Sequence, residues 1–392
     1  MSRMSMPARG IVLASFAVML TAACTPPMPP DVLAARAESQ IVCAPGSLDI
    51  AVAETFAGAM TAVGDALTSI CPDQSIAEIP SDQAASLVLV DRTPTAADIA
   101  DFGSANCPAG APIVVPAFGY PVSMAYNVPG LEGLVMTPEA VAGIMNGTVT
   151  SWEDPLLAEA NPDFDLSGLP PITLMSVETT QGAVEAMSSW ASALAPDSWT
   201  AGTVGTLDAG TRLPTVTDLI GEISVTEGAI AVLPVFQAFN NVLAVANLPV
   251  VATDSDGNAT EVVVTADDVQ LYKVGSGATT VTTDETGNIL ASPAIGGVPV
   301  EGNFDVASSK IVLGEDQALI GWPVLGYAHV LICDDPADRL ALSFAQYVVR
   351  LAGQGSLETF GLTPMPEPIR VKTFIPLKVT VQSDGGSATP SP

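Results

Sequence analysis

Positive charge is scarce in this chain of 392 residues. Its 12 lysines and arginines are outnumbered by 42 aspartates and glutamates, and the formal net charge is −30. This balance excludes a nucleic-acid-binding protein, or one that binds anionic membranes by charge, because both need a basic surface. A small bound anion stays compatible with it, since local N–H dipoles can outweigh a distant field. We interpret most of the acidity as a solvated exterior.

Histidine is scarcer still, which argues against several catalytic and metal sites. The only histidine, His329, lies in a predicted apolar strand, where a core role is expected. The cysteines do not have a zinc-binding spacing, and no Gly-x-Ser-x-Gly elbow precedes a helix. Asp91 and Glu178 suit structural or ligand-pairing roles better than acid–base chemistry. We therefore expect no enzyme, no metal and no cofactor.

The chain begins with the pattern of a secretory leader. Residues 1–23 contain two arginines, a short apolar core and small residues before Cys24. The apolar core is too short for a permanent transmembrane helix. The Thr-Ala-Ala-Cys sequence resembles the lipobox of bacterial lipoproteins, although its usual leucine stands one place early, at Leu20. We expect lipidation of Cys24; the alternative is an ordinary signal peptide followed by a chance cysteine.

Lipidation would anchor the protein to the outer face of a bacterial cell membrane. Residues 24–40 are proline-rich and predict an extended tether, and residues 381–392 predict a disordered tail. The chain between these segments is long enough for two domains. We expect an extracytoplasmic monomer.

Four cysteines remain after Cys24, an even number that suits disulfides in an oxidising compartment. Three connectivities are possible. We favour Cys43–Cys71, which would join the entry to the first strand with the end of the first helix. Cys107–Cys333 would then be the long-range bridge.

The first part of the chain alternates strands with helices, which predicts a mostly parallel α/β sheet. Ligands of such sheets bind at the carboxyl ends of strands. Thr55, Ser81 and Asp91 each stand at such an end, and Ser81 also suggests the start of a short helix. The expected strands are 47–53, 75–79 and 87–90, and the expected helices are 55–70 and 95–102.

Two apolar segments, 113–127 and 320–333, predict crossings between two lobes. Pro116, Gly119 and Pro121 interrupt the first of them, so we do not expect it to be one continuous strand. The resulting first lobe comprises 41–120 and 322–380, and the second comprises 121–321. Two lobes joined in this way enclose a cleft, as in hinge-closing solute-binding proteins.

The second lobe is expected to contain its own helices and strands and a set of added β-hairpins. Hairpin turns are predicted at 256–257 and 286–288. The other expected elements are helices 137–145 and 182–194, strands 172–175 and 229–233, hairpins within 245–310, and a final first-lobe helix, 335–354.

Residues 125–155 read AYNVPGLEGLVMTPEAVAGIMNGTVTSWEDP. This segment resembles the phosphate-binding lipoproteins of bacterial phosphate ABC transporters, which carry AYN-PG and G-ITxWxDP. PITL at Pro171, EGAIAVLP at Glu227 and GWPVLGYAHVLIC at Gly321 resemble later segments of the same family. The resemblance implies a two-lobed periplasmic-binding-protein-like α/β fold, a phosphate ligand and an ABC permease as partner.

The resemblance also implies first-lobe binding residues. AETFAGA resembles the family's GATFP turn, so Thr55 would supply a hydroxyl and a backbone N–H, and Phe56 an apolar wall. Ser81 stands where the family has a Ser-Gly-Gly turn, without the glycines. VDRTPT resembles S-D-x-P-L-T, and Asp91 would accept the proton that phosphate retains and sulfate lacks.

The second-lobe turn departs from the family pattern R-S-D-G-S-G-T. Here the arginine is Val177, the second serine is Gln181 and the threonine is Ala183, while Gly182 is retained. The lost charge-assisted bonds amount to about 5–10 kcal/mol, or roughly three to seven decades in affinity. Glu178 adds repulsion.

Gln181 and the N–H groups from Gly182 onward remain as donors, and Arg92 and Arg212 are the candidate cations to replace the lost arginine. Three functions therefore stay open. The protein delivers phosphate to a transporter with weakened or altered affinity; it binds a different ligand, such as an amine paired with Glu178 and Asp91; or it is a surface scaffold that binds no small ligand.

Overall fold

The computed structural model describes residues 38, 40–253, 259–266, 279–293, 300–302, 304–305, 310–311, 318–320 and 322–379. The expected leader, Cys24, most of the tether, the tail and the turn at 256–257 lie outside these ranges. Within them, no helix has both the length and the apolar character that a bilayer crossing needs.

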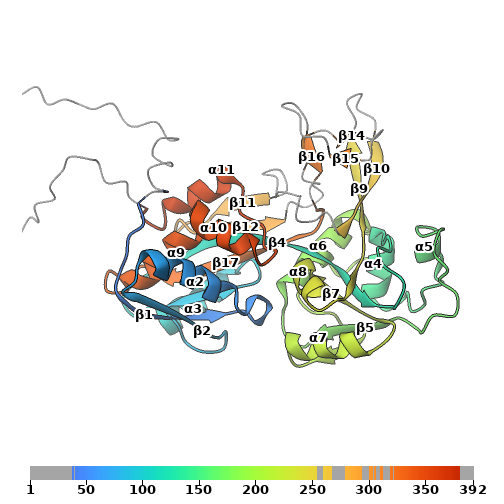
Figure 1. The fold of residues 1–392 in the computed structure, drawn as a ribbon, viewed down its shortest axis with the longest axis horizontal. Helices are drawn as coiled ribbons and strands as arrows, with labels where there is room; N and C mark the ends of the chain where they lie inside the picture. The colour runs from blue at the N-terminus through green and yellow to red at the C-terminus, as the bar shows by residue number, and fades with distance from the viewer. Residues whose placement is uncertain are drawn as a thin grey trace, which may run out of the picture.

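A two-lobed α/β fold is organised around one mixed sheet that runs through both lobes (Figure 1). Its strand order is β2-β1-β3-β17-β4-β7-β5-β6, and β8 pairs with β4. Strands β1 to β3 are parallel in the first lobe, and β5 to β7 are parallel in the second. The bounds are β1 Gly46–Val52, β2 Gln74–Pro80, β3 Leu87–Val90, β4 Pro112–Asn127, β5 Thr173–Val177, β6 Thr211–Leu213, β7 Ala229–Pro234, β8 Ala244–Val245 and β17 Leu325–Cys333.

Several helices begin where the sequence places a capping side chain. Thr95 forms a capping box with Asp98 at the start of α3, and Thr137 caps α4 ahead of a proline in its first turn. The helices are η1 Glu54–Phe56, α2 Ala59–Ile70, α3 Ala96–Asn106, α4 Pro138–Met145, α5 Pro155–Ala158, α6 Gly182–Leu194, α7 Val216–Val225, α8 Val235–Asn240, α9 Arg339–Val348, α10 Leu351–Glu358, α11 Glu367–Arg370 and η4 Val371–Phe374.

The expectation that residues 113–127 are not one strand is wrong, because β4 is continuous and crosses between the lobes. Its first part pairs with β17 up to Pro121, and its second part pairs with β7 from Val122 onward. Pro121 therefore stands where the strand changes partner. Pro116 lies opposite a bulge at Ala328/His329. Both prolines thus occupy irregular points of the ladder, where a missing N–H is tolerated.

Two further helix predictions are wrong. Residues 81–83 form a turn rather than a short helix, since the chain passes directly into the approach to β3. The final helix is split into α9 and α10. Gly353 lies so close to the carbonyl of Tyr347 that a β-carbon would overlap it, which is the close approach of a sharp turn between two helices.

The sequence suggested that all the added hairpins belong to the second lobe. One of them instead packs on the first lobe. Within the described residues, β11 Thr279–Thr283 pairs with β12 Ile289–Pro293, and β12 packs against β4 and β17 of the first lobe. The Asn288 Oδ1 atom accepts a 2.8 Å bond from the Val114 N–H. The other described antiparallel pairs outside the main sheet are β9 Leu248–Thr253 with β10 Ala259–Val264, β13 Val300–Gly302 with β16 Ala318–Ile320, and β14 Phe304–Asp305 with β15 Lys310–Ile311.

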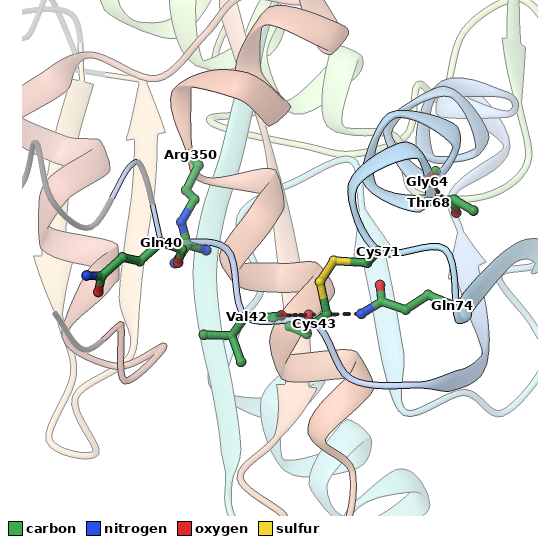
Figure 2. Close-up of a disulfide and its surroundings, with 9 residues drawn as sticks. Gln40, Val42, Cys43, Gly64, Thr68, Cys71, Gln74 and Arg350 are labelled. Atoms are coloured by element: carbon green, nitrogen blue, oxygen red, sulfur yellow. Dashed lines mark hydrogen bonds between the residues drawn. A yellow bond between two sulfur atoms is a disulfide. The ribbon is translucent and has the colours of Figure 1, made fainter. Parts of the chain in front are cut away.

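Two disulfides tie the first lobe together, and they are the pairings favoured from the sequence. Cys43 is bonded to Cys71, and Cys107 is bonded to Cys333. The first bridge fastens the N-terminal segment to the end of α2 (Figure 2). Just before it, the Gln40 carbonyl accepts a 2.9 Å bond from the Arg350 guanidinium.

The N-terminal segment is held by a second group as well. The Arg370 side chain is 2% exposed and forms ion pairs with Glu38 and Glu367. It also donates to the Val349 carbonyl at 3.0 Å and lies over the Phe374 ring. Glu38 and residues 40–43 are therefore held against the folded first lobe.

Candidate functional site

Asp91 lies at the centre of the contact between the two lobes. It directly follows β3 and is 8% exposed. Its Oδ2 atom accepts hydrogen bonds from the Thr55 hydroxyl at 3.3 Å and from the Gly182 N–H at 3.1 Å. Burial raises the pKa of its carboxyl, while the bonds from Gly182 and Thr55 oppose that rise. The structure thus brings together three of the residues expected to bind a ligand.

Gly182 allows the second lobe to approach Asp91 directly. A β-carbon at this position would overlap the Asp91 carbonyl oxygen and the Tyr120 hydroxyl. That hydroxyl donates a hydrogen bond to the same Asp91 carbonyl. The first N–H of α6 is therefore bonded to Asp91 itself, and no anion fits between them in this arrangement.

Three more hydrogen bonds join the lobes beside this contact. The Glu54 carboxylate accepts from the N–H groups of Val216 at 3.0 Å and Thr217 at 2.9 Å, at the start of α7. The Gln237 amide donates to the Thr55 carbonyl at 3.0 Å. The turn that carries Thr55 is thus held by both α7 and α8 of the second lobe.

Phe56 forms part of an aromatic cluster behind these bonds. Its ring meets Phe118 edge-on at 4.9 Å and Tyr120 at 5.1 Å, and it stacks with Phe236 of α8 at 6.2 Å. Because the ring is 1% exposed, its place in this structure is core packing across the lobes.

Arg92 does not neutralise Asp91 directly. Its guanidinium makes a bidentate pair with Asp98 at 2.7 and 2.8 Å, and this pair lowers the pKa of the Asp98 carboxyl. Glu185 of α6 is close enough for its charge to act on the Arg92 guanidinium. Burial raises the pKa of Glu185 to about 7, with Arg92 acting against the rise. The positive charge of Arg92 thus interacts with three carboxylates, those of Asp98, Glu185 and Asp91.

The remaining expected residues lie apart from Asp91. Ser81 is exposed and lines a 370 Å³ cavity beside α3, whose lining includes Arg92 but neither Thr55 nor Gly182. Arg212 is exposed and pairs with Asp208 at 3.1 Å. Glu178 is also exposed. Neither arginine therefore replaces the cation missing from the second-lobe turn.

Three buried side chains of the second lobe have polar atoms that lack partners within the described structure. Gln181 is 5% exposed and Ser176 is 3% exposed. The Gln181 Oε1 and Ser176 Oγ atoms have no hydrogen-bond partner there, and neither has the Gln237 Oε1 atom. Two of the three are acceptors only, which is unfavourable for an anionic ligand.

His329 is a buried core residue, as expected, but it also supports the site. Its Nε2 atom accepts a 3.0 Å bond from the Ala291 N–H, which leaves Nδ1 to donate to the Arg92 carbonyl at 3.1 Å. It therefore connects the β11–β12 hairpin to the residue after Asp91. Burial lowers the pKa of the imidazole to about 4.

This shift predicts a loss of stability in acid that His329→Gln will not show. Between pH 6.5 and about 4 the unfolded chain binds a proton that the folded chain does not. From pH 7.5 to 4, the wild type should lose about 3 kcal/mol more free energy of unfolding than the variant. Urea titrations at each pH measure the difference, and an imidazole NMR titration midpoint near 6.5 would contradict the prediction.

Sequence reasoning missed Glu54, Tyr120, Glu185 and Gln237. Glu54 directly precedes the expected Thr55, and Thr215 with Asp218 is a recognisable cap for α7, but nothing local links the two. Among the described residues, no cluster of three or more histidine, cysteine, aspartate or glutamate side chains is placed to hold a metal.

Comparisons with known proteins agree with this architecture. Several solved phosphate-binding proteins share the fold at low identity. A high-affinity periplasmic phosphate-binding protein, PfluDING, solved with phosphate, is 15% identical with a TM-score of 0.55, covering 84% of this chain and 93% of its own. A human phosphate-binding apolipoprotein is 14% identical with a TM-score of 0.54, covering 84% and 94%.

No curated protein sequence matches. A family model, the PBP superfamily domain, matches residues 43–350. Since this match spans both lobes and most of the chain, the protein belongs to the PBP superfamily.

Proposed function

We propose that the protein is an extracytoplasmic solute-binding protein of the phosphate-transporter type, with a cleft that binds phosphate weakly. The observation that carries the proposal is the convergence of Thr55, Asp91 and the α6 N-terminus from the two lobes on one point. A hydroxyl, a proton-accepting carboxylate and a helix N-terminus suit protonated phosphate. The fold shared with phosphate-binding proteins supports the same ligand class.

The weak affinity follows from the second-lobe turn. Val177 is 1% exposed and Ala183 is 2% exposed, so these positions add neither charge nor hydroxyl. A bound anion must also displace Asp91 from the Gly182 N–H.

We further propose cleavage of the leader, lipidation of Cys24 and delivery of the ligand to an ABC permease. The first lobe would comprise about 41–120 plus 322–380, and the second about 121–321. Ser81, Gln181, Arg92 and Arg212 would at most assist binding from the edge of the cleft.

Calorimetric titration with phosphate tests the proposal. The mature chain should bind phosphate with a dissociation constant of about 10 μM to 1 mM, and sulfate should give no heat. Asp91→Asn should abolish the preference for phosphate, whereas Glu178→Gln, on the exposed turn, should leave affinity within about twofold. Submicromolar binding would contradict the claim of weak affinity.

A second candidate is a surface scaffold that binds no small ligand. The direct bond between Asp91 and Gly182 favours it, because it satisfies both groups without a ligand. Absence of heat and of thermal stabilisation at millimolar phosphate would reject phosphate binding and favour the scaffold.

A further inference from the structure

Two first-lobe carboxylates lie on the N-terminal ends of two second-lobe helices. Asp91 accepts from the Gly182 N–H at the start of α6. Glu54 accepts from Val216 and Thr217 at the start of α7, and also from the Thr217 hydroxyl at 2.6 Å. Helix N-terminal N–H groups have no partner within the helix and favour negative charge. Both helix ends are therefore occupied by anions that belong to the chain.

The two helix ends differ in how their first N–H groups are satisfied. The α7 N-terminus has its own cap, since the Thr215 hydroxyl accepts from the Asp218 N–H at 3.0 Å. Glu54 takes the two N–H groups that Thr215 leaves. The N-cap of α6 is Gln181, whose side chain makes no capping bond. At α6, the carboxylate of Asp91 does what a local cap does elsewhere.

Other contacts close the same surface. Gln237 binds the Thr55 carbonyl, and Phe236 stacks on Phe56. The lobes thus meet through hydrogen bonds, two carboxylate–helix contacts and an aromatic pair, all between residues of this chain.

We propose that Asp91 and Glu54 are internal anions that hold the lobes closed without any bound ligand. The inference goes beyond the proposed function, because it concerns the ligand-free state and holds whether or not phosphate binds. If so, the ligand-free population of this protein is mostly closed. A free anion then competes with Asp91 for the α6 N-terminus and does not drive closure.

Hydrogen exchange of the two helix ends tests this directly. The mature chain, secreted with Cys24→Ala so that no lipid is attached, is compared with the Asp91→Asn/Glu54→Gln double variant, without phosphate and with 10 mM phosphate, a concentration of the order needed to saturate weak sites. Mass spectrometry follows peptides covering 178–190 and 213–222. The wild type should be protected without phosphate and unchanged by it. The double variant should exchange roughly tenfold to a hundredfold faster at both helix ends.

Matched controls separate closure from general destabilisation. Glu178→Gln removes an exposed carboxylate from the same turn and should exchange like the wild type. Peptides of β1 and β17 should keep their protection in every variant that folds. Wild-type helix ends that become protected only with phosphate would overturn the proposal, as would a folded double variant with unchanged protection. Calorimetry reads phosphate binding independently, so a failure of one proposal is not mistaken for a failure of the other.

Discussion

Gly182→Ala should lower the free energy of unfolding by about 2–4 kcal/mol. The added β-carbon would overlap the Asp91 carbonyl and the Tyr120 hydroxyl, and neither can move freely. The Asp91 carbonyl belongs to the backbone directly after β3. The Tyr120 side chain is completely buried in β4. Relief requires α6 to withdraw, which breaks the bond between Gly182 and Asp91 and leaves a buried carboxylate poorly satisfied.

Gly221→Ala is the matched control for this prediction. Gly221 lies within α7, and a β-carbon there meets no atom within 4 Å. It should raise stability by about 0.5–1 kcal/mol, the usual gain for alanine over glycine in a helix. Urea unfolding of both variants measures the contrast. Similar effects from the two substitutions would show that the close approach at Gly182 is unimportant.

Removal of the long-range disulfide should have the largest effect on stability. Cys107 and Cys333 are 226 residues apart, so their bond removes a large loop entropy from the unfolded chain. In the loop-entropy account, Cys107→Ala/Cys333→Ala costs about 5 kcal/mol. Cys43 and Cys71 are 28 residues apart, and their removal costs about 3.5 kcal/mol.

Comparison of the two double variants tests the role of loop length. Each replaces one disulfide by two alanines; Cys43 is exposed whereas Cys71, Cys107 and Cys333 are buried, so the long-range bridge also loses more packing. Denaturant midpoints of both variants, alongside the reduced wild type, give the measurement. An equal or greater loss from the shorter loop would contradict the loop-entropy explanation.

The local elements could be predicted because their patterns are short-range. Helix α6 and strand β3 have the bounds expected from apolar spacing and from the turn residues around them. Strand β4 could not be predicted as one continuous strand, because prolines normally argue against a central strand. The change of partner at Pro121 and the bulge opposite Pro116 explain their place. The β11–β12 hairpin was expected in the second lobe because sequence position does not reveal which surface a hairpin covers.

The candidate site was also predictable in part: its residues could be predicted from the sequence, but their contacts could not. Thr55, Asp91 and Gly182 could be singled out from the ends of strands, from a helix start and from a family resemblance. Their direct contact could not, because it depends on how far the lobes have closed, and local sequence does not encode that distance. Arg92 was a candidate ligand for a similar reason. Its bidentate partner Asp98 also completes the capping box of α3 with Thr95, and the two functions of one aspartate are visible only in three dimensions.

The attachment of Glu38 and residues 40–43 to the first lobe has a mechanical consequence. Tension applied to the chain ahead of Glu38 enters the protein through Arg370. It also enters through Arg350 and the Cys43–Cys71 bridge (Figure 2). All of these lie in the first lobe, and none is on the segments of β4 and β17 that connect the lobes. A pull from the N-terminus therefore enters through the first lobe, and the hinge transmits only the resistance of the second lobe.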